Sequence, residues 1–281
     1  MDERGIKKVK ACNLAVCQMV VSDDKAANLK KAEKMIREAV REENADLVVL
    51  PEIFNGPYDV AVMQDSAEDE DGPTCRMLST LAKELGIIII GGSIAEKSGD
   101  NLYNTSFTFN EEGIRLGRHR KLHLYDVDIP GGISFQESAV VMPGNEITVF
   151  DTSVGRLGIA ICYDIRFPEL IRLMVLQGAE IIIIPAAFNT ITGPDHWHET
   201  IKIRAVDNQV YMVAASPARN HASTYHAFGH SKIVDPWGTV MAEIDEKEGI
   251  ISAKLDPERL KKVRMELPLL KHRREDLYNL G

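Results

Sequence analysis

The chain has 281 residues, a formal net charge of −9 and a hydrophobic content of 44%. This length suits one large domain or two small ones, and the composition is globular rather than disordered or fibrous. The negative charge disfavours nucleic acid as a partner, because phosphate backbones would be repelled. No apolar run reaches the roughly 18 residues of a membrane helix, so no membrane partner is expected.

The chain start and the cysteines favour a reducing compartment. Residues 1–10 are rich in charge and lead into a strand-like stretch without a cleavage pattern, so we expect no secretory signal. The four cysteines are too few for a disulfide scaffold: Cys12, Cys17, Cys75 and Cys162. The expected location is therefore the cytoplasm.

Short aliphatic strands alternate with amphipathic helices along the first half of the chain. A strand is predicted at 13–21, and a helix over 24–43 has apolar residues at helical spacing. A buried strand at 47–50, a second helix that ends at Gly86 and a strand at 87–90 follow. This alternation predicts an α/β fold, and no Gly-, Pro- or Ser-rich linker divides the chain.

The second half of the chain repeats the order of the first. The segment 159–162 matches 14–17, and each is followed by a helical stretch and by four aliphatic residues before Pro-x-x-Phe-Asn, at Pro51 and at Pro185. Chance similarity between α/β strands is the alternative, but four matches occur in the same order. We interpret the chain as two similar β/α halves that form a helix–sheet–sheet–helix sandwich.

Cys162 is a candidate nucleophile. It follows the predicted strand 157–161 and precedes Pro168, which suits the first turn of a helix. A thiol on such a turn lies near free backbone N–H groups, which favour a thiolate and can bind an oxyanion. An inert core cysteine is the alternative, and this is the role that we expect for the other three cysteines.

Two charged residues are candidates for acid–base chemistry. Glu52 follows a buried strand, so desolvation should raise its pKa toward the range of a general base, unless it is a solvated loop residue. Lys121 belongs to the charged run 118–123. Such a run is usually a solvated face, but one lysine can point into a cleft and stabilise a thiolate and an oxyanion.

No metal or cofactor is expected from the sequence. None of the histidines has the spacing of a zinc site, including His196, His198, His221, His226 and His230. We expect structural or substrate-lining roles for them. No phosphate loop and no dinucleotide fingerprint occur in the required context.

Three motifs resemble those of the nitrilase superfamily of carbon–nitrogen hydrolases. They are Leu50–Glu52, Arg120–Leu124 and Ile161–Glu169, and together they are specific in their order and spacing. The resemblance extends from about Val9 to Tyr278. It implies an enzyme with an αββα four-layer sandwich.

The resemblance also implies which residues form the site. A catalytic triad falls on Glu52, Lys121 and Cys162, and Glu137 is a second glutamate at the site. The hydrolase domain is expected over residues 9–255, and the subunits of the family dimerise through the helices farthest from the sheets. Here a homodimer or higher homo-oligomer is expected, in which residues 256–281 reach the partner subunit.

The implied reaction proceeds through a thioester on Cys162. Glu52 accepts the thiol proton, and the Lys121 ammonium and the Tyr163 backbone N–H hold the oxyanion. A catalytically silent scaffold is the alternative from another functional class, but a scaffold needs none of the three side chains of the triad.

Within the superfamily, the sequence most resembles the ω-amidases, which hydrolyse α-ketoglutaramate and α-ketosuccinamate. The matching stretches are Phe54–Tyr58, His123–Gly131, Ala187–Thr190, Arg204–Tyr211 and Ala215–Arg219. Deaminated-glutathione amidases resemble the chain strongly too, and other linear amides or N-carbamoyl compounds are further alternatives. The chain departs from the ω-amidase pattern at Gly56 and at Val140–Val141. These departures bear on the identity of the substrate more than on the type of reaction.

A small dicarboxylate monoamide needs a cation for its remote carboxylate. Arg166 is the candidate, because a guanidinium binds a carboxylate in bidentate fashion. An ion pair with Asp164 or Glu169 is the alternative role. The candidates for the pocket wall are Tyr58, Tyr125, Tyr163 and Asn189.

Overall fold

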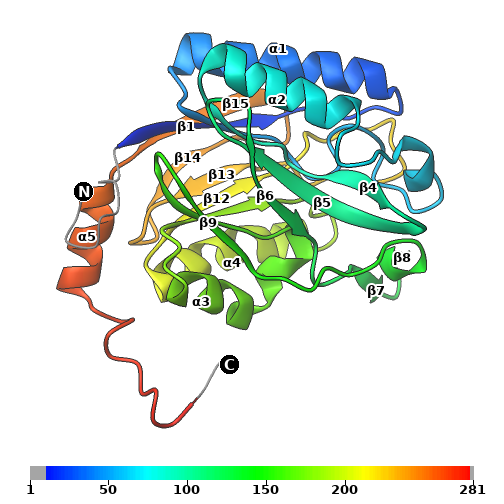
Figure 1. The fold of residues 1–281 in the computed structure, drawn as a ribbon. Coiled ribbons are helices and arrows are strands. Elements are labelled where there is room, and N and C mark those ends of the chain that lie inside the picture. Colours follow the sequence, from blue (N-terminus) through cyan, green and yellow to red (C-terminus); the bar gives the residue numbers. More distant parts are fainter. Residues whose placement is uncertain (1–10, 279–281) are drawn as a thin grey trace.

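The computed structural model describes residues 11–278. Two β-sheets pack face to face, and helices cover the outer side of each sheet (Figure 1). The expected start of the domain, Val9, lies outside the described residues. Within the described part of the chain, no helix combines the length and the apolar character needed to cross a bilayer.

The first sheet contains seven strands. They are β1 (Cys12–Gln18), β2 (Leu47–Val49), β3 (Ile88–Ile90), β4 (Ile94–Ser98), β5 (Asn101–Phe109), β6 (Arg115–Arg120) and β15 (Gly249–Leu255). Their order is β15-β1-β2-β3-β5-β4, and β6 pairs with β5. Strands β1, β2 and β3 are parallel, and the others run antiparallel to their neighbours.

The second sheet contains six strands, and a separate ribbon has two. The sheet consists of β9 (Thr148–Thr152), β10 (Gly155–Ile159), β11 (Ile181–Pro185), β12 (Tyr211–Ala215), β13 (Lys232–Val234) and β14 (Val240–Glu243). Its order is β14-β13-β12-β11-β10-β9, with β10, β11 and β12 parallel. The ribbon pairs β7 (Asp126–Asp128) with β8 (Ser134–Gln136).

Four helices form the outer layers. They are α1 (Lys25–Glu43), α2 (Pro73–Leu85), α3 (Pro168–Leu176) and α4 (Gly193–Asn208). α1 and α2 cover the first sheet, and α3 and α4 cover the second (Figure 1). The Asp24 side chain caps α1 by accepting from the Ala27 N–H, and α2 ends at Gly86 in the left-handed conformation that glycine adopts readily.

Most of the core lies in three apolar layers, one between the sheets and one under each pair of helices. A fourth, smaller cluster surrounds Tyr58. Along β1, Leu14 and Val16 point into the layer between the sheets, whereas Ala15 and Cys17 point toward the helices. Both faces of the central strands are therefore covered, which explains why these strands read as continuous aliphatic runs.

The two halves share one order of elements, as the sequence repeat predicted. β1, α1, β2, α2 and β3 correspond to β10, α3, β11, α4 and β12, and the predicted αββα sandwich is confirmed (Figure 1). The boundaries differ from the predicted ones by a few residues. The strand expected at 13–21 ends at Gln18, and the one expected at 157–161 ends at Ile159.

The C-terminal segment 256–281 first packs on its own chain. Helix α5 (Pro257–Glu266) inserts Leu260 into the layer between the sheets, and the Tyr211 hydroxyl donates to the Asp256 carbonyl at 2.9 Å. Beyond α5 the chain continues past α3 and α4 (Figure 1), and Leu270 packs against the apolar cluster beneath these helices. The contact of this segment with a partner subunit stays a prediction.

Candidate active site

Glu52, Lys121 and Cys162 each lie just beyond the end of a strand. Glu52 follows β2, Lys121 follows β6, and Cys162 follows β10. All three are buried, with exposed fractions of 1%, 0% and 5%. Two charged side chains without solvent need partners inside the protein, and the contacts around Lys121 supply them.

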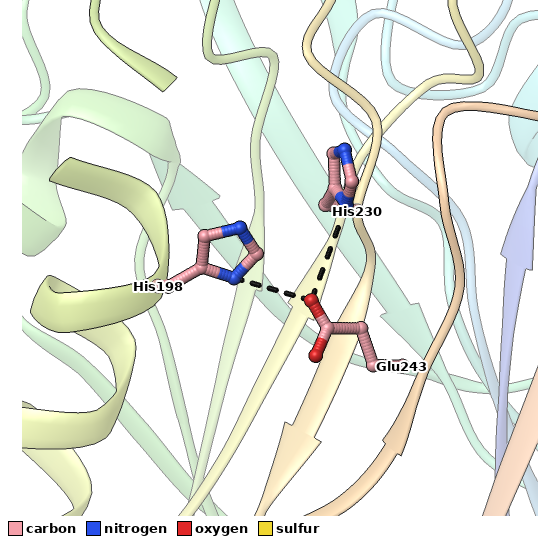
Figure 2. A group of neighbouring side chains, drawn as sticks. All are labelled: His198, His230 and Glu243. Atoms are coloured by element: carbon pink, nitrogen blue, oxygen red, sulfur yellow. Dashed lines mark ion pairs between the residues drawn. The ribbon is translucent and has the colours of Figure 1, made fainter. Parts of the chain in front are cut away.

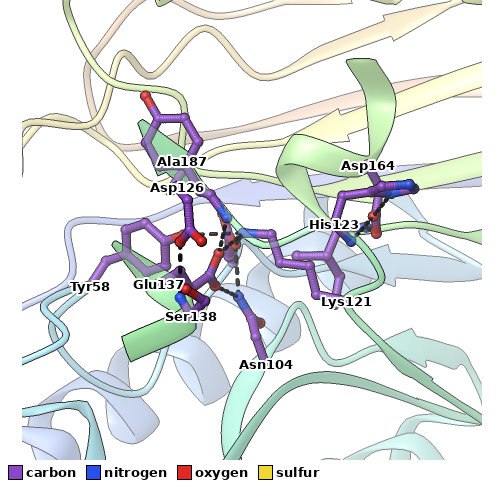
Figure 3. A network of polar contacts seen from close by, with 12 residues as sticks. Tyr58, Asn104, Lys121, His123, Asp126, Glu137, Ser138, Asp164 and Ala187 are labelled. Atoms are coloured by element: carbon purple, nitrogen blue, oxygen red, sulfur yellow. Dashed lines mark hydrogen bonds and ion pairs between the residues drawn. The ribbon is translucent and has the colours of Figure 1, made fainter. Parts of the chain in front are cut away.

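The Lys121 ammonium is held by three acceptors. Its Nζ lies 2.8 Å from Glu137 Oε2 and 3.1 Å from the Tyr58 hydroxyl (Figure 3). The third acceptor is Glu52 Oε1, at 2.9 Å. An ammonium has three N–H donors, so each has a partner and the position of the nitrogen is fixed. The two carboxylates raise the pKa of Lys121 well above its usual value against the opposing effect of burial, so this lysine stays charged.

Asn104 joins the two glutamates, and the sequence analysis missed it. Its Nδ2 donates to Glu52 Oε1 at 2.9 Å and to Glu137 Oε1 at 3.1 Å (Figure 3). Glu137 also accepts from the Tyr125 backbone N–H at 2.7 Å. The available signal was an asparagine in the middle of an otherwise well-formed strand, β5, because a polar side chain buried there needs polar partners.

Glu52 has one carboxylate oxygen left over. Oε1 accepts from Lys121 and Asn104, but Oε2 is buried and has no hydrogen-bond partner among residues 11–278. Burial raises the pKa of Glu52, Lys121 lowers it, and the charge of Glu137 raises it further, with the net effect upward. This is the direction expected from the sequence. The Glu52 carboxylate also interacts with the thiol of Cys162, whose pKa is raised by burial and by this carboxylate.

Cys162 lies on a strained turn. It begins the 3₁₀ turn Cys162–Arg166 with a φ of 47°, in the left-handed region that residues other than glycine rarely adopt. Such strain is common at functional sites and costs on the order of 1–3 kcal/mol.

The turn and the lysine do not by themselves make Cys162 a thiolate. Burial raises the pKa of Cys162 well above its usual value, and the charge of Glu52 raises it further. Lys121 and a hydrogen bond from the Ala187 backbone lower it, but they do not compensate. The resting group is therefore a thiol, and it needs a base before it can attack.

Aromatic rings surround the charged centre. Tyr58 and Tyr125, both predicted to line the pocket, are buried. Phe135 and Tyr225, which the sequence analysis did not single out, complete the wall: the ring of Tyr58 is 5.2 Å from that of Phe135 and 4.9 Å from that of Tyr225. The predicted wall residue Tyr163 is half-buried, with its ring 5.2 Å from that of Tyr125.

A cavity of about 30 Å³ adjoins this wall, lined in part by Glu52, Tyr58, Ala187 and Tyr225. It has room for about two water molecules. The side chain of Asn189, another predicted wall residue, donates to the Tyr125 hydroxyl at 2.9 Å. Its oxygen accepts from the backbone N–H groups of Ile191 and Thr192, directly before α4, so this side chain also shapes the turn that leads into the helix.

Arg166 carries a charge that no carboxylate neutralises within residues 11–278. Its guanidinium hydrogen-bonds His196, with 3.1 Å between Nη1 and Nδ1, and lies over the Phe188 ring at 4.7 Å. The ion pairs considered from the sequence, with Asp164 or Glu169, are not formed in the described part of the chain. A half-buried guanidinium without an anionic partner can accept the carboxylate of a ligand.

A second polar cluster lies at the β13–β14 edge of the second sheet (Figure 2). Ligand-type atoms of His198, His230 and Glu243 lie within 4.8 Å of one another, although their spacing in the sequence matches no metal motif. The Lys232 ammonium lies 2.5 Å from His198 Nδ1 and 3.3 Å from Glu243 Oε1. A metal ion here would have to displace that ammonium, so we assign no metal to the cluster.

Comparison with known proteins agrees with this geometry. A family model described as carbon-nitrogen hydrolase matches residues 13–265. Omega-amidase NIT3 of Saccharomyces cerevisiae is 49% identical over 265 residues, which cover 92% of this chain and 91% of that protein. Omega-amidase NIT2 of Bos taurus is 45% identical, with 95% and 96% of the two chains covered.

Two solved structures have the same fold. Nit3 of Saccharomyces cerevisiae, described as a member of branch 10 of the nitrilase superfamily, matches with a TM-score of 0.87 and 44% identity over 94% of this chain and 97% of that one. The NitFhit protein of C. elegans matches with a TM-score of 0.88 and 33% identity over 97% and 67%. The expected superfamily and enzyme class are confirmed, and the chain belongs to the carbon–nitrogen hydrolase family of the nitrilase superfamily.

Proposed function

We propose that this enzyme is an ω-amidase, which hydrolyses the side-chain amide of a small dicarboxylate monoamide, such as 2-oxoglutaramate, to the dicarboxylate and ammonia. The observation that carries the proposal is the arrangement around Lys121. A buried ammonium is fixed between two carboxylates, and one of these carboxylates, Glu52, also interacts with a buried thiol. Base, cation and nucleophile are the three groups that amide hydrolysis through a thioester requires.

The first step removes the proton of Cys162. Glu52 Oε2 accepts this proton, and the sulfur attacks the amide carbonyl carbon to form a tetrahedral oxyanion. The C–N bond then breaks, Glu52 gives the proton to the departing nitrogen, and ammonia leaves a thioester on the sulfur. A water molecule, for which the cavity beside Glu52 has room, loses a proton to Glu52 and attacks the thioester carbonyl. The C–S bond breaks to release the acid, and the sulfur takes the proton from Glu52, which restores the thiol and the carboxylate.

Lys121 stabilises the oxyanion in both halves of the reaction. Its charge persists at neutral pH because the two carboxylates raise its pKa. The three N–H groups of Lys121 are already paired, so it acts on the oxyanion through its charge. The Tyr163 backbone N–H, at the start of the same turn as Cys162, is the hydrogen-bond donor that we assign to the oxyanion. A single donor of this kind is worth roughly 10²–10³-fold in rate.

Two features support a substrate with a remote carboxylate. The NIT3 and NIT2 relatives are named omega-amidases and are 49% and 45% identical to this chain. The guanidinium of Arg166 has no carboxylate partner among the described residues and is half-buried, so we assign it to the carboxylate of the substrate. Tyr58, Tyr125 and Asn189 are the proposed walls of the binding site.

The proposed assembly is a cytoplasmic homodimer. Leu176 on α3 and Ile203 on α4 are 44% and 45% exposed on the outer helical layer, where large apolar side chains favour contact with a second copy. The oligomeric state is measured by sedimentation velocity.

The test compares ammonia release from 2-oxoglutaramate, deaminated glutathione and N-carbamoylputrescine. We expect 2-oxoglutaramate to be the best substrate and Cys162→Ala to have no activity. Cys17→Ala is the matched control, because Cys17 occupies the corresponding place in the first half and is buried in the core. Intact-mass analysis should detect an acyl adduct on Cys162. Near-wild-type activity of Cys162→Ala would refute the mechanism, and a preference for deaminated glutathione would refute the substrate.

A further inference from the structure

Asp164 forms a buried junction two residues after Cys162. Its carboxylate has no exposed surface and accepts four hydrogen bonds. Oδ1 accepts from the His123 backbone N–H at 2.9 Å and from His123 Nδ1 at 2.8 Å. Oδ2 accepts from the Ile161 backbone N–H at 2.9 Å and from His119 Nε2 at 3.2 Å.

The donors come from the two segments that carry the amine and the thiol. His119 and His123 stand two residues before and two residues after Lys121, and Ile161 directly precedes Cys162. Figure 3 shows Asp164 and His123 beside Lys121. The carboxylate therefore ties the end of β6 to the turn after β10, although 41 residues separate Asp164 from His123.

Both imidazole rings are held on a second side. His119 Nδ1 lies 2.9 Å from the Thr148 hydroxyl on β9, and the ring of His123 stacks on Phe167 at 3.6 Å. Burial alone would raise the pKa of Asp164, but the hydrogen bonds from His119 and His123 hold it well below its usual value. The junction is thus a fully paired carboxylate between rigid neighbours.

We propose that Asp164 is a positioning residue, which sets the distance between the Lys121 ammonium and the Cys162 sulfur through its contacts with His119, His123 and Ile161. The proposal rests on the proposed amidase function. Asp164 itself has no part in the chemistry, because all four of its contacts are with protein groups. Its removal should therefore slow the chemical step without weakening substrate binding.

The decisive variant is Asp164→Asn, which keeps the shape of the side chain. One oxygen becomes an NH₂ group, which cannot accept a hydrogen bond, so two of the four hydrogen bonds are lost. The new NH₂ group then lies against the two N–H donors that had bonded to the oxygen. A displacement of about 1 Å between reacting groups can cost about 10²-fold in rate. We expect kcat to fall by about 10²-fold and KM for 2-oxoglutaramate to stay within about twofold.

Asp235→Asn is the matched control. Asp235 is also a buried carboxylate, which accepts from the Trp237 and Thr239 backbone N–H groups and from Arg259, in the turn between β13 and β14. Its substitution should lower the unfolding midpoint and leave kcat unchanged. If Asp164→Asn behaves in the same way as Asp235→Asn, with wild-type kcat for the folded protein, Asp164 is only structural and the proposal fails.

A second pair of variants keeps the test decisive if Asp164→Asn does not fold. His119→Gln retains an N–H donor near Nε2, whereas His119→Leu removes it. We expect kcat of the Gln variant to exceed that of the Leu variant by at least about tenfold at equal KM. Equal kcat values would overturn the proposal. A wild-type protein that releases ammonia from no amide would instead refute the proposed function.

Discussion

Asn104 offers a sharp test of the polar network, because it donates from one nitrogen to both glutamates of the site. Asn104→Leu keeps the volume of the side chain and removes both hydrogen bonds. Hydrogen bonds to charged groups contribute about 1.5–3 kcal/mol, so the loss is about 3 kcal/mol at the low end of that range. The Oδ1 atom of Asn104 is buried without a partner, so its removal returns about 1 kcal/mol.

The expected net loss of stability is thus about 2 kcal/mol, which lowers the thermal midpoint by roughly 4–8 °C for a chain of this size. Asn208→Leu is the control, because Asn208 is also buried and, among residues 11–278, donates only to the Arg204 carbonyl. Circular dichroism measures both midpoints. Equal midpoints for the two variants would show that the hydrogen bonds from Asn104 to the two glutamates do not contribute the stability calculated above.

Two further predictions concern catalysis. Burial raises the pKa of Glu52, and its protonated form cannot accept the proton of Cys162. The value of kcat/KM should therefore fall at low pH, with the acid limb of the pH–rate profile above the ordinary glutamate pKa of 4.5. An acid limb at or below 4.5 would contradict the role of Glu52 as the base. Arg166→Lys replaces a bidentate donor by a point charge, so KM for 2-oxoglutaramate should rise about tenfold with kcat nearly unchanged. An unchanged KM in steady-state assays would show that Arg166 does not bind the substrate carboxylate.

Much of the fold follows from local patterns. The capped helix at Lys25–Glu43 and the aliphatic strands on either side of it were predicted within a few residues, because hydrophobic period and caps are local properties. The repeat of Pro-x-x-Phe-Asn predicted two similar halves, and the matching order of elements confirms them. Resemblance added the triad positions, which no local pattern places together.

The rest of the site depends on contacts between distant segments. Asn104 and Glu52 are 52 residues apart, and Asp164 reaches back 45 residues to His119. The cluster of His198, His230 and Glu243 arises in the same way, when α4 packs against β13 and β14. Spacing in the sequence cannot find such groups, because their proximity is created by the packing of the sheets and helices.

Opposing effects decide the protonation state of Cys162. The turn with its backbone N–H groups and Lys121 favour a thiolate, whereas burial and the charge of Glu52 favour the thiol. A carboxylate and a thiolate buried side by side repel each other, and the charge of Glu52 therefore opposes ionisation of the thiol. A resting thiolate would add a second buried negative charge, and burial together with the charge of Glu52 accordingly raises the pKa of the thiol.

The same surroundings explain why a thiol that is hard to ionise can still react. Glu52 is also raised in pKa, by burial and by Glu137, so its affinity for a proton increases together with that of Cys162. Transfer of the proton from sulfur to Glu52 keeps the net charge of the centre constant, because one anion replaces another. Attack on the amide then moves this negative charge onto the carbonyl oxygen, where Lys121 provides the stabilising cation. Such a centre needs no resting thiolate, because the nucleophile forms only when the thiol proton is transferred to the neighbouring base, Glu52.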